Sequence, residues 1–183
     1  MDQIQPPKNP TPTVTLRPCR PSDLDALVAW AWDPRILQFL RRGPLANSDE
    51  ARHYLTTHIL PHPYCRAICV DDRPVGMIKV NPGPAHEPFK ASVGYSLAYD
   101  YWGRGIATVV LKMVVGDVFK SWAHLVRLEA IADVENPASQ RVLEKAGFKR
   151  EGVLRKFVML KGEYRDMVMF SYLASDDPII YDN

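Results

Sequence analysis

The spacing of apolar residues along the chain changes several times, and each spacing predicts a different element. Segments in which apolar or β-branched residues alternate with polar ones, or form short runs between turn residues, predict strands. Segments with apolar residues at i, i+3, i+4 and i+7 predict helices. The expected strands cover 13–19, 65–70, 75–82, 90–98, 126–133, 148–160 and 163–174, and the expected helices cover 23–32, 48–60, 105–120 and 137–147.

Local signals set the ends of the first two helices. Ser22 precedes two aspartates and predicts an N-cap, and Pro34 is expected to stop the helix that follows. The second helix is expected to start near Asn47 or Ser48 and to end at Pro61. These signals separate the helices from the strands on either side.

The order of these elements predicts the fold class. One strand, two helices, three strands, a helix, a strand, a helix and two strands follow one another, which is not the regular alternation of a doubly wound fold. We expect an α+β domain over 13–175 with about seven strands and about four helices. Proline-rich residues 1–12 are expected to be a disordered tail, and 176–183 a second tail.

Charge and composition exclude several classes of function. The 183 residues include 23 basic and 21 acidic ones, so bulk charge does not favour nucleic-acid binding. No apolar run approaches the ~20 residues that span a bilayer, so no membrane association is expected. Three cysteines and five histidines form no metal-ligand pattern, so we expect no metal, no disulfide framework and a reducing, cytoplasmic location.

A double-glycine turn between an expected strand and an expected helix is the first candidate for chemistry. In "WGRGIAT", Gly103 and Gly105 flank Arg104. The glycines could serve only a turn that requires positive φ, or they could open a helix N-terminus to a phosphate. The dinucleotide fingerprint fails because Thr108 stands where its third glycine would be, and no Gly-Lys-Ser/Thr follows for a P-loop.

A second segment decides between these interpretations. In "ENPASQRVLEKAGF", Asn136 suits an N-cap, Pro137 suits the first helical position, and Gly147 suits the left-handed position after the helix. A well-capped helix explains these residues in part. Their position about 30 residues after the glycine turn, with a helix and a strand between, adds a specific spacing.

Together the two segments resemble the Gcn5-related N-acetyltransferase (GNAT) superfamily, in particular the branch that contains the ribosomal-protein N-terminal acetyltransferases of the RimJ/RimL type. The resemblance extends from about Thr13 to Ala174. It implies a three-layer fold around a mostly antiparallel, twisted sheet. It also implies that the strand before the turn carries a bulge and splays from its neighbour, and that pantetheine lies in the gap.

The resemblance implies that acetyl-CoA is the co-substrate. The glycine turn would bind its pyrophosphate, although Trp102 stands where the superfamily usually has Gln or Arg. Asn136 matches the family asparagine beside the pantetheine arm. The implied coenzyme contacts are Leu97, Ala98, Tyr99, Trp102, Gly103, Arg104, Gly105, Ile106, Ala107, Thr108, Asn136 and Ser139.

The acid and the base are less well marked. Many superfamily members have a tyrosine acid seven residues after the asparagine, but Leu143 is found there. Ser139 is the candidate acid by resemblance to RimL-like proteins, or a polar residue of the first helical turn. Glu129 and Asp166 are candidate bases, or partners of Arg127 and Arg165.

The amine that receives the acetyl group is not marked by any motif. Tyr95 and Tyr164 could line its site. The expected activity is transfer of acetyl from acetyl-CoA to a primary amine, on a protein N-terminus or a small molecule, by direct attack. The alternative is a non-catalytic module that binds coenzyme A for sensing. Either a monomer or a homodimer fits.

Overall fold

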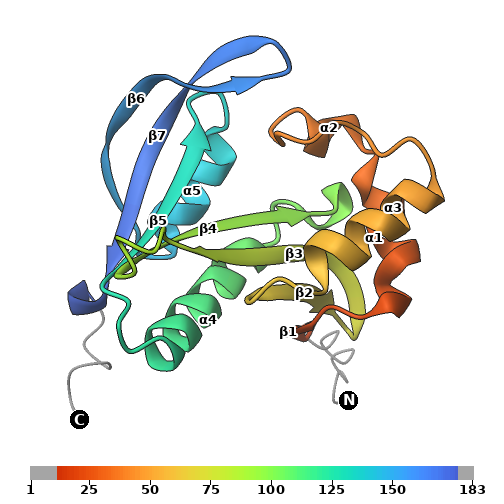
Figure 1. Cartoon of the computed structure of the whole chain (residues 1–183), viewed down its shortest axis with the longest axis horizontal. Helices are drawn as coiled ribbons and strands as arrows, with labels where there is room; N and C mark the ends of the chain where they lie inside the picture. The colour runs from red at the N-terminus through yellow and green to blue at the C-terminus, as the bar shows by residue number, and fades with distance from the viewer. Residues whose placement is uncertain (1–11, 177–183) are drawn as a thin grey trace, which may run out of the picture.

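The computed structural model describes residues 12–176, which form one sheet with helices on both faces (Figure 1). The expected tails at 1–12 and 176–183 fall outside this range, apart from residue 12 and residue 176 at its two ends. The strands are β1 (Val14–Pro18), β2 (Cys65–Val70), β3 (Arg73–Pro82), β4 (Lys90–Leu97), β5 (Arg127–Asp133), β6 (Lys149–Leu160) and β7 (Glu163–Leu173). The α-helices are α1 (Leu24–Ala31), α2 (Pro34–Leu37), α3 (Ser48–Tyr54), α4 (Ile106–Ser121) and α5 (Pro137–Lys145).

Within the described range, four short helical turns adjoin these helices and strands. A 3₁₀ turn, η1 (Pro21–Asp23), leads into α1, and a π-helical turn, η2 (Leu55–Ile59), continues α3. Two further 3₁₀ turns are η3 (Tyr99–Tyr101), which follows β4, and η4 (Ala174–Asp176), which follows β7. The α+β class is confirmed, and so is the expected order of elements apart from one additional short helix, α2.

The sheet has seven strands in the order β1-β2-β3-β4-β5-β7-β6. All neighbours are antiparallel except β4 and β5, which are parallel. Helices α4 and α5 pack into the larger of two apolar cores, in which Val110, Val114 and Leu143 are fully buried. Helices α1 and α3 form a second core against Cys65 and Met77. The cores on the two faces give three layers.

The parallel pair in the middle of the sheet is short. Strand β4 pairs with β3 along Ala91–Leu97, but with β5 only along Lys90–Ser92. Beyond Ser92 the two strands diverge, so the sheet opens at its centre. The expected splay is confirmed, but the expected bulge is absent, because the β3–β4 register continues without a shift to Leu97.

The structure adds three details to the expected helices. The cap of α1 is Asp23 rather than Ser22, because η1 precedes the helix. Pro34 begins α2 instead of only ending a helix, because Asp33 caps it by accepting a hydrogen bond from the N–H of Arg35 (2.9 Å). Helix α2 brings the number of described α-helices to five, rather than about four.

A charged clamp holds the start of α1 on β1. The guanidinium of Arg17 donates to both carboxylate oxygens of Asp23 (2.7 and 2.8 Å), and the N–H of Arg20 donates to the same carboxylate (2.8 Å). Burial of Asp23 raises its pKa, but these hydrogen bonds outweigh burial and hold the pKa below its usual range. The clamp positions Leu27 and Trp30 of α1, which line the cleft described below.

We expect Asp23→Asn to lower the free energy of unfolding by about 2 kcal/mol at pH 7, because it breaks a mostly buried ion pair. Since the folded-state pKa is depressed, the stabilisation is present above pH ~4 and is lost as the pH falls through that pKa. Urea unfolding of both proteins between pH 2 and 7 measures this. An equal difference between them at every pH would contradict the assignment.

Candidate active site

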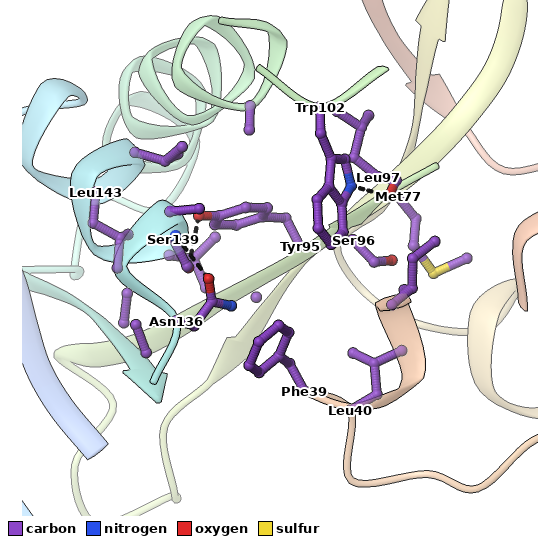
Figure 2. Close-up of a pocket in the computed structure, with 18 of the residues that line it drawn as sticks. Phe39, Leu40, Met77, Tyr95, Ser96, Leu97, Trp102, Asn136, Ser139 and Leu143 are labelled. Atoms are coloured by element: carbon purple, nitrogen blue, oxygen red, sulfur yellow. Dashed lines mark hydrogen bonds between the residues drawn. The ribbon is translucent and has the colours of Figure 1, made fainter. Parts of the chain in front are cut away.

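The divergence of β4 and β5 opens into a cleft of about 1050 Å³. The N-terminus of α4 and the N-terminus of α5 both reach it, because α4 follows β4 through the glycine turn and α5 follows β5 directly. A cavity of this volume is large enough for an elongated cofactor-sized molecule. Figure 2 shows Trp102, Tyr95 and Ser139 around this space, with Phe39 and Leu40 from the segment after α2 facing it as well.

The glycine turn presents backbone donors to the cleft. Gly103 (φ +73°) and Gly105 (φ +76°) are left-handed, a conformation that favours glycine. The first intrahelical bond of α4 runs from the N–H of Val109 to the carbonyl of Gly105 (3.1 Å), so the N–H groups of Ile106 to Thr108 have no intrahelical acceptor. A Cβ at either glycine would meet nothing within 4 Å, so an anion can approach this positive helix end.

The open edge of β4 offers a second set of backbone groups. The N–H of Ala98 donates to the carbonyl of Val75 (2.7 Å), which fixes the alternation of the ladder. The N–H and C=O groups of Tyr95 and Leu97 therefore point away from β3, toward the gap. The indole N–H of Trp102 already donates to the carbonyl of Leu97 (2.7 Å), as Figure 2 shows. Trp102 thus ties the glycine turn to the end of β4.

A chain of hydrogen bonds joins α5 to β4. The side chain of Asn136 caps α5 by accepting from the N–H of Ser139 (3.0 Å), as the sequence predicts. The Ser139 hydroxyl and the Tyr95 phenol lie 2.9 Å apart, and either can donate. Burial raises the pKa of Tyr95 to about 12, against the opposing effect of the hydrogen bond with Ser139. The phenol therefore stays protonated at physiological pH.

Most of the predicted coenzyme residues line the cleft. Three do not: Ala98, Tyr99, which stacks under the guanidinium of Arg35 (3.5 Å), and Arg104, which lies over the ring of Tyr101 (5.2 Å). Tyr164 is 63% exposed and is also not part of the lining. The predicted residues that do line the cleft are Tyr95, Leu97, Trp102, Gly103, Gly105, Ile106, Ala107, Thr108, Asn136 and Ser139.

The two candidate bases are not brought to the cleft. Glu129 accepts from Arg127 (2.7 Å), the ion pair that was the alternative to a catalytic role. Asp166 accepts from the backbone N–H of Lys156 (2.7 Å) rather than from Arg165. Both carboxylates are therefore held in the sheet, on residues that do not line the cleft.

Among the described residues that line the cleft, Asp133 is the one carboxylate. It is buried, and Arg165 and the N–H of Glu135 donate to its oxygens (3.0 and 2.8 Å). Leu143, found where many superfamily members have their tyrosine acid, is 1% exposed and offers no proton. Ser139 therefore remains the candidate acid, because its hydroxyl lies in the cleft and is oriented by the hydrogen bond with Tyr95.

Sequence reasoning missed the side of the cleft opposite the glycine turn. Its residues come from α1, the irregular segment between α2 and α3, the end of α3, β3 and the β6–β7 hairpin, where no motif marks them. One signal was present: Met77, Lys79 and Asn81 alternate with apolar residues on β3, which indicates that this face is not fully buried. The missed residues are Leu27, Trp30, Phe39, Leu40, Arg41, Arg42, Tyr54, Met77, Lys79, Asn81, Val158, Leu160 and Met167.

Residues 12–176 contain neither a metal-ligand cluster nor a membrane-spanning helix. No group of three or more His, Cys, Asp or Glu side chains is arranged to hold a metal ion. None of the helices there is long and apolar enough to cross a bilayer.

Comparison with known proteins identifies similar chains. Residues 13–149 match the family model of the acetyltransferase (GNAT) domain. The uncharacterized N-acetyltransferase p20 of Bacillus licheniformis is 28% identical over 91% of this chain and 96% of its own. Mycobacterium smegmatis RimJ, solved in complex with CoA-disulfide, is 25% identical, with a TM-score of 0.76 over 90% of this chain and 84% of its own. A GNAT-family acetyltransferase from Bacillus anthracis, 20% identical, shares the fold with a TM-score of 0.78 over 87% and 94%.

A matched pair of glycine variants tests whether the glycine turn binds phosphate. Gly105→Ala puts a side chain on a left-handed residue at the helix end, so we expect the dissociation constant for coenzyme A to rise at least about tenfold by calorimetry. Gly116→Ala lies within α4, where a Cβ also meets nothing within 4 Å. It should stabilise the fold by about 0.5–1 kcal/mol and leave coenzyme A binding unchanged. Equal affinities in both variants would exclude the glycine turn as the phosphate site.

Proposed function

The chain belongs to the acetyltransferase (GNAT) family, which makes it an acetyl-CoA-dependent N-acetyltransferase, and we propose that its acceptor is the α-amine of a peptide or amino acid. The observation that supports binding of the co-substrate is the cleft itself, into which two helix N-termini and the open edge of β4 converge. The pyrophosphate would bind the N–H groups of Ile106, Ala107 and Thr108. The pantetheine arm would run along Tyr95 and Leu97 toward Ser139.

The choice of an α-amine follows from the absence of a free base in the described lining. Asp133, the one carboxylate there, is held by Arg165 and by a backbone N–H. A lysine side chain has a pKa near ~10.4 and is almost wholly protonated at pH 7.5, whereas an α-amine has a pKa near ~7.8 and is substantially neutral. An α-amine can therefore attack without a strong base on the protein.

The proposed chemistry delivers one proton to the sulfur of coenzyme A and removes one proton from the attacking amine. The neutral amine nitrogen attacks the thioester carbonyl, a C–N bond forms, and the C–S bond breaks as coenzyme A leaves. Ser139 donates its hydroxyl proton toward the sulfur while Tyr95, 2.9 Å away, donates to the serine oxygen. The attacking nitrogen releases its extra proton to water, and water returns one proton to Tyr95, so that coenzyme A leaves as the thiol and both hydroxyls are restored. Tyr95 thus supplies from β4, through Ser139, the phenol that is missing at Leu143.

Free thiols support the predicted cytoplasmic location. Cys19, Cys65 and Cys69 are free thiols, and the Sγ atoms of Cys19 and Cys65 lie 3.8 Å apart in a hydrogen bond rather than a disulfide. Persistent thiols are usual in reducing compartments. Acetyl-CoA as co-substrate fits the same location.

We expect kcat/KM for a peptide with a free N-terminal α-amine to exceed that for the same peptide, N-terminally blocked and bearing one lysine, by roughly 10²-fold at pH 7.5. It should rise tenfold per pH unit below pH ~7.7 and then level off, as the α-amine loses its proton. Tyr95, with a pKa of about 12, should add no limb below pH 10. Thiol release measures both. A preference for the lysine peptide would refute the proposed acceptor.

Replacing Ser139 tests the proposed acid. Ser139→Ala keeps the backbone N–H that Asn136 caps, so α5 should remain folded. We expect kcat to fall on the order of 10²-fold, with the KM for acetyl-CoA little changed.

Ser92→Ala is the matched control, because Ser92 lies on β4 but does not line the cleft. An unchanged kcat in Ser139→Ala would remove Ser139 from the mechanism. Tight coenzyme A binding without turnover on any amine in the unmodified protein would favour the non-catalytic module.

A further inference from the structure

The charge in the cleft is far less balanced than the charge of the chain. The whole sequence has 23 basic and 21 acidic residues. Of the described residues that line the cleft, however, one is acidic, Asp133, and its charge is already paired with Arg165. The basic residues of the lining are Arg41, Arg42, Lys79, Lys112, Arg141 and Lys145.

These cations divide into two groups by their place in the fold. Lys112 on α4, with Arg141 and Lys145 on α5, belongs to the two helices whose N-termini open into the cleft, on the side that fits the phosphates of coenzyme A. Arg41, Arg42 and Lys79 come from the segment after α2 and from β3. We call these three the acceptor-side cations. The phosphate side does not account for them, since they come from other elements.

Two of the acceptor-side cations, Arg42 and Lys79, lie over one aromatic ring. The guanidinium carbon of Arg42 lies 5.6 Å from the centre of the Tyr54 ring, and Nζ of Lys79 lies 5.4 Å from it. Contact with the ring favours both cations and orients them. Within residues 12–176, no Asp or Glu forms an ion pair with Lys79 or Arg41.

The sheet leaves room for a ligand beside Lys79. In the β3–β4 register Lys79 stands opposite Gly94, where a Cβ would meet nothing within 4 Å. The neighbouring residue on β4 is Tyr95, whose phenol contacts Ser139. Side chains alternate along a strand, so Tyr95 points to the α4/α5 face of the sheet, whereas Lys79 shares the α1/α3 face with Met77. A molecule bound over Gly94 would therefore lie on the Lys79 face, and its amine would reach the proposed reaction centre through the gap between β4 and β5, where residues from both faces line the cleft.

We infer that the acceptor carries a carboxylate close to its α-amine, and that the acceptor-side cations bind this carboxylate. Like charges disfavour an ammonium, so the same cations would also lower the pKa of the acceptor amine and increase its reactive neutral form. A partly enclosed cleft strengthens both effects relative to water. This inference rests on the proposed function. The carboxylate could be an acidic side chain near a peptide N-terminus or the α-carboxylate of a free amino acid.

Paired substrates test the inference on the unmodified enzyme with acetyl-CoA. One pair is two peptides that share an N-terminal serine and differ in Asp-Glu or Lys-Lys at the next two positions. The other is a free amino acid and its amide. We expect kcat/KM to favour the carboxylate member of at least one pair by about tenfold, and the pair affected identifies the source of the carboxylate. Equal rates within both pairs would overturn the inference but leave the proposed function intact. Turnover of none of these four substrates would overturn both the inference and the proposed function.

Charge reversal assigns the preference to Lys79. Lys79→Glu should reduce the ratio of kcat/KM for the Asp-Glu peptide to kcat/KM for the Lys-Lys peptide at least tenfold, with the KM for acetyl-CoA unchanged. Lys79→Gln should give an intermediate ratio. Arg150→Glu makes the same charge change on exposed β6, outside the cleft lining, and should keep the ratio of the unmodified enzyme. If Lys79→Glu or Lys79→Gln retained that ratio as fully as Arg150→Glu, the role given to Lys79 would be wrong.

Discussion

The short parallel pairing of β4 and β5 is the constraint on which the rest of the site depends. Three residues of each strand pair, and the strands then separate. Each strand is held on its far side, β4 by β3 and β5 by β7, so the opening does not unravel the sheet. The gap exposes backbone groups of β4, and the connections after the two strands bring the starts of α4 and α5 to its edges. A longer parallel ladder would pair the exposed backbone groups of β4 and would close the gap that the starts of α4 and α5 reach.

Around this gap, small local interactions set the geometry. The indole of Trp102 fastens the glycine turn to Leu97, and Asn136 begins α5 so that Ser139 faces Tyr95. The superfamily's usual Gln or Arg at position 102 is thereby replaced by a residue with a visible structural role. Tyr95 on β4 meets α5 at Ser139, one turn before Leu143, and in the proposed mechanism its phenol would take the place of the tyrosine that is missing there. The arrangement keeps a phenol and a helix N-terminus together without the usual sequence positions.

Much of the fold could be predicted from the sequence, because the spacing of apolar residues and the residue types at turns and helix ends are local features. The mostly antiparallel sheet and the splay of the strand before the glycine turn came only from the resemblance, and the strand order came only from the structure. The residue types at Asn136 and Gly147 did indicate the two ends of α5. The α2 helix was missed because Asp33 and Pro34 can end one helix and begin another. The acceptor side could not be predicted, since Arg42, Tyr54 and Lys79 meet only through tertiary packing. Glu129 and Asp166 looked like candidate bases because sequence does not show which face of a strand carries a partner.

The central claim is that coenzyme A occupies the gap between β4 and β5, with its pyrophosphate on the start of α4 and its thioester beside Ser139. A crystal structure with acetyl-CoA, or a non-hydrolysable analogue, tests this most directly. The account predicts phosphate oxygens within hydrogen-bond distance of the N–H groups of residues 106–108, and the thioester sulfur within reach of the Ser139 hydroxyl. A coenzyme bound outside the gap, or a β4–β5 ladder that closes along its whole length, would contradict it.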